Sequence, residues 1–123
     1  MWGSVLDKRG YLWFGLESRP EKPPAACYWD GEKLNLIELD VEATSQGKSI
    51  HRVLVDDTGK VWLAGYGLFR ETRGGFGFEE VPCKFDDPIL DFIQRRDCTF
   101  LIATDGGGLF GMRGGAMTRL ASE

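Results

Sequence analysis

Short runs in which hydrophobic and polar residues alternate are separated by glycine-containing turns along most of the chain. The stretch DDTGKVWLAG, residues 56–65, places an Asp before a turn that ends in Gly59, with an apolar run around Trp62 after it. Glycine adopts the positive φ that tight hairpin turns require, and a preceding Asp can accept hydrogen bonds from the turn amides. Alternating runs joined by such turns predict an all-β chain of antiparallel hairpins.

The same stretch occurs three times, which indicates an internal repeat. DKRGYLWFGL, residues 7–16, aligns with residues 56–65 at an offset of 49 between the turn glycines (59 − 10). A third, divergent copy, RRDCTFLIATD, has Cys98 at the turn glycine and Leu101 at the tryptophan position, 39 residues further on (98 − 59). Each copy is preceded by one more apolar run and followed by a strand–turn–strand pattern. Every unit is therefore expected to contain four short strands.

Residues 86–96, DDPILDFIQRR, fit two structures when taken alone. An Asp-Pro start and the helical spacing of Ile89, Phe92 and Ile93 favour a helix. The repeat instead requires a strand at this place, which residues 49–56 supply in the second unit. The register of the repeat therefore favours a strand.

Four antiparallel strands in about 40 to 45 residues match the size of a β-propeller blade. The expected fold is a single β-propeller segment with three four-stranded antiparallel sheets as its blades, at residues 1–40, 49–82 and 87–121. Recurring aromatic residues are expected to pack between the blades, as aromatic side chains do in cores. They are Trp13, Trp62, Phe14, Phe69 and Phe110.

Three blades alone do not close a ring, because closed propellers have about four to eight blades. The first and last sheets would then expose apolar faces, which favours aggregation unless another surface covers them. Either two identical chains form a homo-oligomer that closes a six-bladed ring, or the three blades belong to a longer propeller. The sequence leaves both arrangements open.

Composition narrows the classes of function. Hydrophobic residues make up 42% of the 123 residues and charged residues 28%, as in soluble globular proteins. The net charge of −4 lacks the positive balance that nucleic-acid binding needs, and no apolar run approaches the roughly 20 residues of a membrane-spanning helix. Cys27, Cys83 and Cys98 form no C-x-x-C pair and His51 is the sole histidine, so no metal site or other cofactor is expected.

The motif resembles the two-component regulator propeller repeat, whose pattern is an Asp, a turn Gly, an apolar–Trp–apolar–Gly strand and then a Gly-Leu-aromatic strand. The matching residues of the second unit are Asp56, Gly59, Val61, Trp62, Leu63, Ala64, Gly67, Leu68 and Phe69. The third unit departs most, with Arg95, Cys98 and Leu101 at the Asp, Gly and Trp positions. The resemblance implies a propeller fold and a sensor role in signal transduction, because such repeats lie in the extracytoplasmic part of bacterial hybrid sensor kinases. No signal peptide is evident, so the expected compartment is the cytoplasm, or the periplasm for a fragment of a sensor.

The copies differ most in one loop, where we expect ligand binding. Residues 16–25, LESRPEKPPA, are inserted where the second unit has only residues 65–67. Proline and charged residues cannot extend a sheet, so this loop projects into solvent on the face that also carries turns of the other blades. The expected ligand-binding residues are Glu17, Arg19, Tyr66, Asp105 and His51.

The expected function is non-enzymatic recognition of a small ligand, a glycan or a protein segment. One alternative is a carbohydrate-active hydrolase or lyase, with Glu17, Asp105 and His51 as acid or base and paired carboxylates roughly 5 to 10 Å apart. Another is a pure self-assembly element that uses its blade-end surfaces. Asp7 and Asp56, which are conceivable metal ligands, are explained by stabilisation of their turns.

Overall fold

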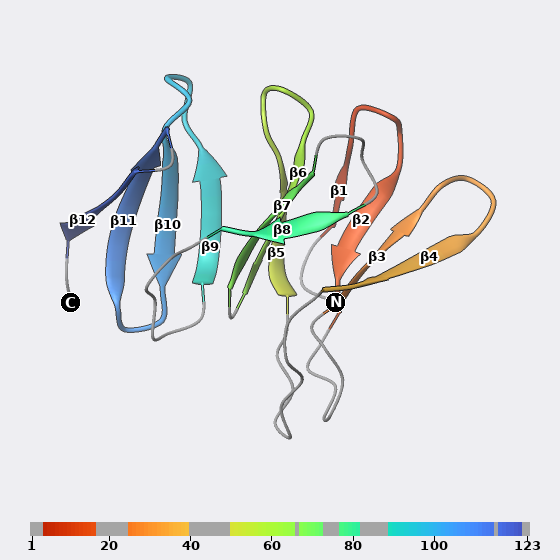
Figure 1. Cartoon of the computed structure of the whole chain (residues 1–123), viewed down its shortest axis with the longest axis horizontal. Coiled ribbons are helices and arrows are strands. Elements are labelled where there is room, and N and C mark those ends of the chain that lie inside the picture. Colours follow the sequence, from red (N-terminus) through yellow and green to blue (C-terminus); the bar gives the residue numbers. More distant parts are fainter. Residues whose placement is uncertain are drawn as a thin grey trace.

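The structure is a computed structural model. The residues that it describes form twelve strands, joined by turns, and no helix (Figure 1). These residues are 4–16, 25–39, 50–65, 67–72, 77–81, 89–114 and 116–121, without the His51 side chain. The strands are β1 (Ser4–Leu6), β2 (Leu12–Gly15), β3 (Ala25–Trp29), β4 (Leu34–Glu38), β5 (Ile50–Val55), β6 (Val61–Gly65), β7 (Leu68–Glu71), β8 (Phe78–Glu80), β9 (Ile89–Gln94), β10 (Phe100–Thr104), β11 (Gly108–Arg113) and β12 (Ala116–Ala121). The expected all-β fold is confirmed. Within these ranges there is no helix that could cross a membrane.

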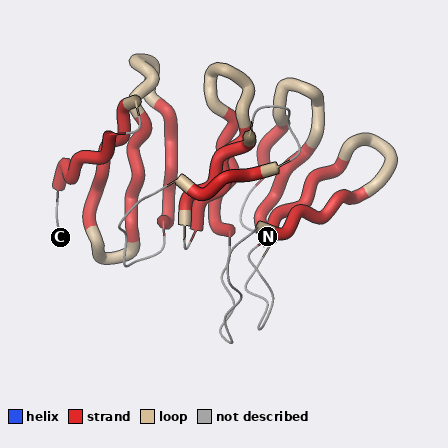
Figure 2. The backbone as a smooth tube through the Cα atoms, in the orientation of Figure 1, coloured by secondary structure: helices blue, strands red, loops and turns tan. Residues whose placement is uncertain are grey.

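The strands form three four-stranded antiparallel sheets, each built from strands that follow one another in the chain (Figure 2). Sheet 1 has the order β1-β2-β3-β4, sheet 2 the order β5-β6-β7-β8, and sheet 3 the order β9-β10-β11-β12. The expected three four-stranded antiparallel sheets are therefore confirmed.

Residues 89–94 form strand β9, so the strand interpretation is confirmed and the helix is excluded. β9 pairs with β10, and an irregularity in the register places one extra residue of β9 between Ile89 and Asp91. This bulge turns Ile89 and Phe92 to the same face although they are three residues apart. Both are buried against sheet 2, which explains why the segment also has helical spacing.

The tight turns between the first two strands of each sheet have the backbone that the repeat predicts. The φ angle is +86° at Gly10 and +91° at Gly59. Cys98 holds the equivalent position with a φ of +68°, and no other non-glycine residue in the described ranges has a positive φ. A β-carbon in this conformation costs about 1 kcal/mol, so the third turn carries strain that the first two avoid.

Neighbouring sheets pack face to face through two hydrophobic clusters. The cluster between sheets 1 and 2 contains Trp13, Ala26, Leu39, Ile50, Val61, Leu63 and Phe69. The cluster between sheets 2 and 3 contains Trp62, Ala64, Leu68, Ile89, Phe92, Phe100, Ile102 and Met112. Strand β6 contributes to both, because alternate residues of a strand point to opposite faces. All five residues of β6 are therefore buried.

The first two strands of neighbouring sheets lie closest together. β5 lies against β1 and β2, and β9 lies against β5 and β6. β4 and β12 lie at opposite ends of the molecule, so the sheets spread outward from their first strands (Figure 1). Sheets arranged in this way fit the blades of a β-propeller.

The contact between sheets 1 and 2 leaves no room for a side chain at Gly15. A β-carbon there would clash with the Ile50 carbonyl oxygen and would lie 2.8 Å from Ile50 Cγ2. Beside it, the Ile50 amide donates a hydrogen bond to the Leu16 carbonyl at 3.3 Å. A small residue is needed here because the two backbones approach closely.

Phe14 belongs to neither of the two clusters between the described sheets. Trp13, Trp62 and Phe69 belong to the two clusters and Phe110 packs against the second, as predicted. Phe14 lies instead on the face of sheet 1 that points away from sheet 2. The reason is strand alternation: Trp13 faces sheet 2, so the next residue faces the other way.

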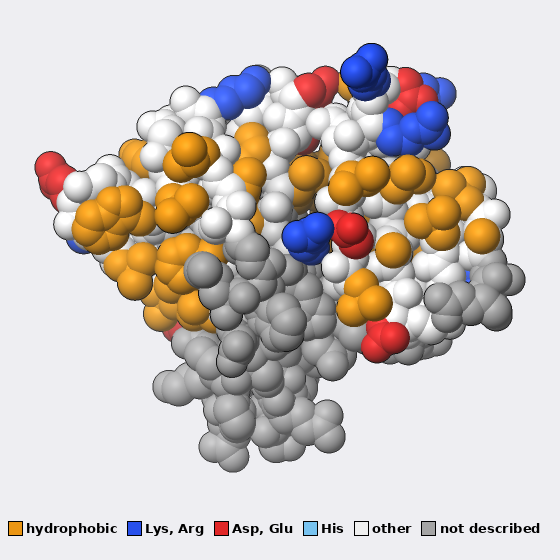
Figure 3. Space-filling model, turned by 180° about the vertical axis from the view of Figure 1, so that it is seen from behind, with side chains coloured by type: hydrophobic (Ala, Val, Ile, Leu, Met, Phe, Trp, Pro, Cys, Tyr) orange, Lys and Arg blue, Asp and Glu red, His pale blue; other side chains and the backbone are white. Residues whose placement is uncertain are grey.

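Two apolar sheet faces have no neighbouring sheet within the described residues. Residues paired across strands share a face, so the register assigns the side chains to each one. The outer face of sheet 1 carries Leu6, Leu12, Phe14, Trp29, Leu34 and Leu36. The outer face of sheet 3 carries Ile93, Leu101, Ala103, Leu109 and Leu120. Seen from behind, hydrophobic side chains gather over sheet 1 at the left and over sheet 3 at the right (Figure 3).

Candidate functional site

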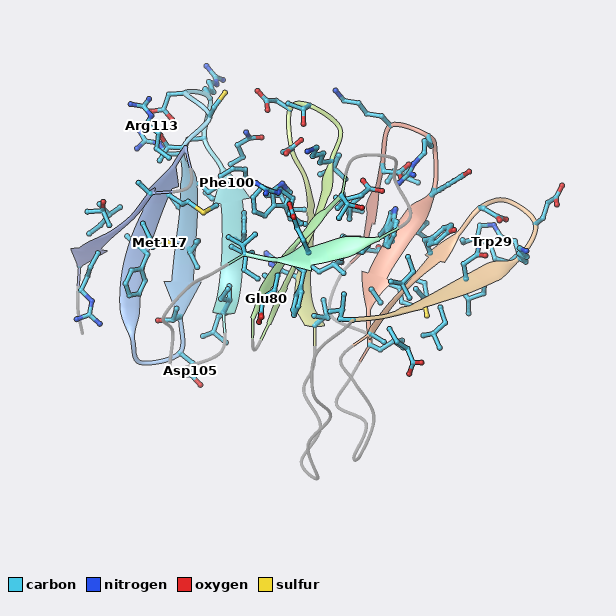
Figure 4. The ribbon with its side chains drawn as sticks, in the orientation of Figure 1. Trp29, Glu80, Phe100, Asp105, Arg113 and Met117 are labelled. Atoms are coloured by element: carbon cyan, nitrogen blue, oxygen red, sulfur yellow. The ribbon has the colours of Figure 1, made fainter. Side chains whose placement is uncertain are left out.

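Of the five expected ligand-binding residues, the structure describes the side chain of Asp105 only. Glu17, Arg19 and Tyr66 lie outside the described residues, and His51 is described only as backbone of β5. Asp105 is exposed in the turn between β10 and β11. It projects at the end of sheet 3 opposite to the end with Arg113 (Figure 4), and we call its end of the sheets the loop end. For the hydrolase alternative, the structure describes the side chain of Asp105 and does not describe those of Glu17 and His51.

The turn that carries Asp105 is held by its neighbours. The hydroxyl of the buried Thr104 donates to the Gly108 carbonyl at 3.0 Å. Nη2 of Arg119, from β12, donates to the Gly107 carbonyl at 2.8 Å. The Asp105 carboxylate itself accepts no hydrogen bond from the described residues. The backbone of the turn is therefore held in place, and the Asp105 carboxylate is exposed to solvent.

The opposite end of the sheets, the turn end, carries the turns between the first two strands of each sheet and is a network of hydrogen bonds between them. Asp57 is central: its carbonyl accepts from Lys8 Nζ at 2.9 Å, and its amide donates to Gln94 Oε1 at 2.9 Å. Its carboxylate accepts from Gln94 Nε2 and from the Cys98 thiol, each at 3.1 Å. These bonds join the three turns and occupy the amide, the carbonyl and the carboxylate of Asp57.

A buried carboxylate links sheets 1 and 2 near this end. Glu71 is 5% exposed; its Oε1 accepts from the Val61 amide and its Oε2 from Arg9 Nη2, each at 3.1 Å. Arg9 Nη2 also lies 2.7 Å from Asp7 Oδ2, so the guanidinium bridges one carboxylate from each sheet. Burial lowers the pKa of Arg9, but the hydrogen bonds and charges of Asp7 and Glu71 outweigh burial and raise it.

Asp7 and Asp56 fix the two glycine turns. Oδ1 of Asp56 accepts two turn amides at 2.9 Å each, and its Oδ2 accepts from Trp62 Nε1 at 2.8 Å. Asp7 accepts two turn amides in the same way and is bonded to Trp13 Nε1 at 2.8 Å. The predicted turn stabilisation is confirmed. The bond to the tryptophan was not predicted, although the equal Asp-to-Trp spacing in the two units is a signal for it.

Burial by itself raises the pKa values of Asp7 and Asp56. The hydrogen bonds outweigh this effect and lower both pKa values below 3.8; they come from the indoles and turn amides, from Arg9 at Asp7 and from Thr58 at Asp56. Both carboxylates therefore stay ionised at neutral pH with their oxygens occupied. In the described part of the chain, no three His, Cys, Asp or Glu side chains lie together as metal ligands would.

Asp57 also controls the protonation of Cys98. Its carboxylate accepts a hydrogen bond from the Cys98 thiol and repels the thiolate, so the pKa of Cys98 is raised above 9.0. The same hydrogen bond, with that of Gln94, lowers the pKa of Asp57 below 3.8. A thiol with a raised pKa is a poor nucleophile, which is the opposite of what a catalytic cysteine needs.

No family model matches the chain, and comparisons with curated proteins and with solved structures found no match. The resemblance to the two-component regulator propeller repeat therefore stays a prediction. The architecture of the sheets and the geometry of their two ends are the basis for a functional proposal.

Proposed function

We propose that the chain is a non-enzymatic recognition module of the β-propeller type that binds its ligand at the loop end. The observation that carries this proposal is the frame of three sheets with their first strands side by side. Such a frame presents loops of successive blades at one end, around the propeller axis. Loops held by a rigid scaffold are a common location for binding sites.

Asp105 is the described residue that best fits a ligand contact. It is exposed, and its turn is fixed by bonds from Thr104 and Arg119. At the turn end, by contrast, Asp57 and Gln94 are bonded to each other. A free carboxylate suits a ligand that offers hydrogen-bond donors, such as sugar hydroxyls, an ammonium group or peptide amides. The sensor role implied by the family resemblance is a proposal of the same kind.

Binding of the purified chain to an oligosaccharide array and to a peptide array tests this proposal. Asp105→Asn and Asp97→Asn are matched variants, because both residues are exposed aspartates in turns of sheet 3 but lie at opposite ends of it. We expect specific binding that Asp105→Asn weakens about tenfold or more, since a charge-assisted hydrogen bond contributes about 1.5–3 kcal/mol. Asp97→Asn should leave it unchanged, and deletion of residues 19–24 should weaken it.

Two results would contradict a recognition surface at the loop end. One is the absence of specific binding to both arrays. The other is binding that Asp97→Asn abolishes and Asp105→Asn leaves intact. Circular dichroism of each variant checks that the Asp→Asn changes have not altered the fold.

A further inference from the structure

The outer faces of sheets 1 and 3 are apolar and open to solvent. On sheet 1, Leu6 is 63% exposed and Trp29 is 44% exposed; on sheet 3, Ile93 is 47% exposed and Leu120 is 53% exposed. Inside the molecule, Leu63 on the face of sheet 2 that meets sheet 1 is fully buried. Contiguous apolar patches of this kind mark interaction surfaces.

The two covered interfaces have a fixed direction. We call the face of a sheet that points to the next sheet along the chain its forward face, and the opposite one its backward face. The forward face of sheet 2, with Trp62, Ala64 and Leu68, packs on sheet 3. Its backward face, with Val61 and Leu63, packs on sheet 1. The uncovered face of sheet 3 is therefore a forward face, and that of sheet 1 is a backward face.

The repeat places equivalent residues on the covered and uncovered faces. Leu101 of sheet 3 takes the position of Trp62 (101 − 62 = 39), and Phe14 of sheet 1 takes the position of Leu63 (63 − 14 = 49). At this position the uncovered forward face thus has a smaller side chain than its covered equivalent. The uncovered backward face has a larger one. Opposite changes in volume on two faces compensate when the faces pack together.

The two uncovered faces lack the ion pair that is present between sheets 1 and 2. There, Arg9 of the first sheet contacts Glu71 of the second at 3.1 Å. The equivalent of Arg9 in sheet 3 is Asp97 (9 + 49 + 39 = 97), and the strand register makes Trp29 the equivalent of Glu71 in sheet 1. The ion pair therefore has no counterpart, and contact between the uncovered faces depends on apolar burial.

We infer that the forward face of sheet 3 docks on the backward face of sheet 1 of a second copy, so that two copies close a six-bladed ring. The partner follows from continuity, because both forward faces already in contact have a backward face of the same repeat as their neighbour. The same contact made twice between two chains of three sheets gives a two-fold ring within the size range of closed propellers. This inference goes beyond the recognition role, since it concerns blade faces and not the loop end.

Size-exclusion chromatography with light scattering tests the ring on the full chain. We expect a mass twice the 13.8 kDa of one chain. Ile93→Arg on the forward face and Leu6→Arg on the backward face should each give the mass of one chain, because each variant disrupts both contacts of the ring. Glu32→Arg, in an exposed turn of sheet 1, is the matched control and should keep the doubled mass. Raising salt from about 0.1 M to about 1 M should not dissociate the wild type, because the contact is apolar.

Mixing the two arginine variants distinguishes this directional contact from other dimers. The mixture keeps one intact contact, between the forward face of the Leu6→Arg chain and the backward face of the Ile93→Arg chain. An open heterodimer at high concentration is therefore expected, and it also shows that both variants are folded. A wild-type monomer, a dimer that only one of the two variants disrupts, or growth to larger assemblies would overturn the inference. A monomer that still binds on the arrays overturns the ring and leaves the recognition role standing, whereas a dimer without binding does the reverse.

Discussion

The indole Nε1 of Trp62 donates a 2.8 Å hydrogen bond to Oδ2 of Asp56, and Trp13 and Asp7 form the same pair in sheet 1. The two tryptophans also belong to the hydrophobic clusters between sheets. Each of these turns is thus oriented by the side chain that fills the adjacent interface. Turn geometry and sheet packing are therefore energetically coupled.

A double-mutant cycle of Asp56→Asn and Trp62→Phe should show this coupling in the free energy of unfolding. Trp62→Phe removes the indole donor from a buried carboxylate, and Asp56→Asn presents an amide NH2 group toward that donor. Hydrogen bonds to charged groups contribute about 1.5–3 kcal/mol, so we expect a coupling energy in that range from urea unfolding. A coupling energy below about 0.5 kcal/mol would show that the bond does not stabilise the fold.

Acid should destabilise the chain through Asp7 and Asp56. In the unfolded chain these carboxyls bind protons near pH 3.8, and in the folded chain only at lower pH. Their stabilising contribution is therefore complete above about pH 4 to 5 and is lost as the pH falls through the folded pKa values. Urea unfolding between about pH 7 and about pH 2 should show a loss of stability that is less steep in the variant with Asp7→Asn and Asp56→Asn. Equal pH dependence in the two proteins would contradict this assignment.

Gly15→Ala should destabilise the contact between sheets 1 and 2. The new methyl group would clash with the Ile50 backbone, which the neighbouring hydrogen bond to Leu16 holds in place. Overpacking of this kind costs about 1–3 kcal/mol. Gly77→Ala is the matched control, because its β-carbon would meet only the Thr72 hydroxyl, at 3.3 Å. If urea unfolding gives the two variants equal stability, the close approach at Gly15 is not a constraint.

The positive φ of Cys98 predicts an order of stability for two substitutions. Cys98→Gly removes the strain of a β-carbon at a φ of +68°, whereas Cys98→Ala keeps the strain and, like the glycine, loses the thiol contact with Asp57. The glycine variant should therefore be more stable than the alanine variant by about 1 kcal/mol in thermal or urea unfolding. An alanine variant at least as stable as the glycine variant would show that the turn does not hold this backbone conformation.

The thiol of Cys98 should titrate at a pH above its ordinary pKa of 9.0, because Asp57 accepts a hydrogen bond from the thiol. The pH dependence of the rate of Cys98 alkylation can follow this titration in a chain whose Cys27 and Cys83 are replaced by alanine and serine. Asp57→Asn removes the negative charge and should lower the apparent pKa of Cys98 and speed its alkylation. An unchanged titration in the Asp57→Asn chain would contradict the hydrogen bond.

Much of the fold could be predicted because its signals are local and repeated. Gly10 and Gly59 mark two turns with positive φ, and the offset of 49 between them defines the unit. The strand at residues 89–94 could be predicted only from the register of the repeat, because a β-bulge gives its apolar residues the spacing of a helix. Phe14 lies on the outer face of sheet 1, because recurrence in the motif identifies a repeated position and not the face to which it points. Its packing against a further blade stays a prediction.

The candidate site could be predicted only in part. Asp105 follows from a glycine-rich turn at the position where the other units have their loops. The bonds of Asp57 connect it to residues 49 and 37 positions away, and no local pattern encodes such contacts. Glu17, Arg19 and Tyr66 lie outside the described residues, so their placement stays a prediction.

Strand β6 supplies Val61 and Leu63 to one cluster and Trp62 and Ala64 to the other. Detachment of this strand would strip Trp13 and Phe100 of packing partners on opposite sides at the same time. The blades are therefore not independent modules that melt one by one. Cooperativity passes through the middle sheet, and heat should produce a single transition in which all three sheets are lost together.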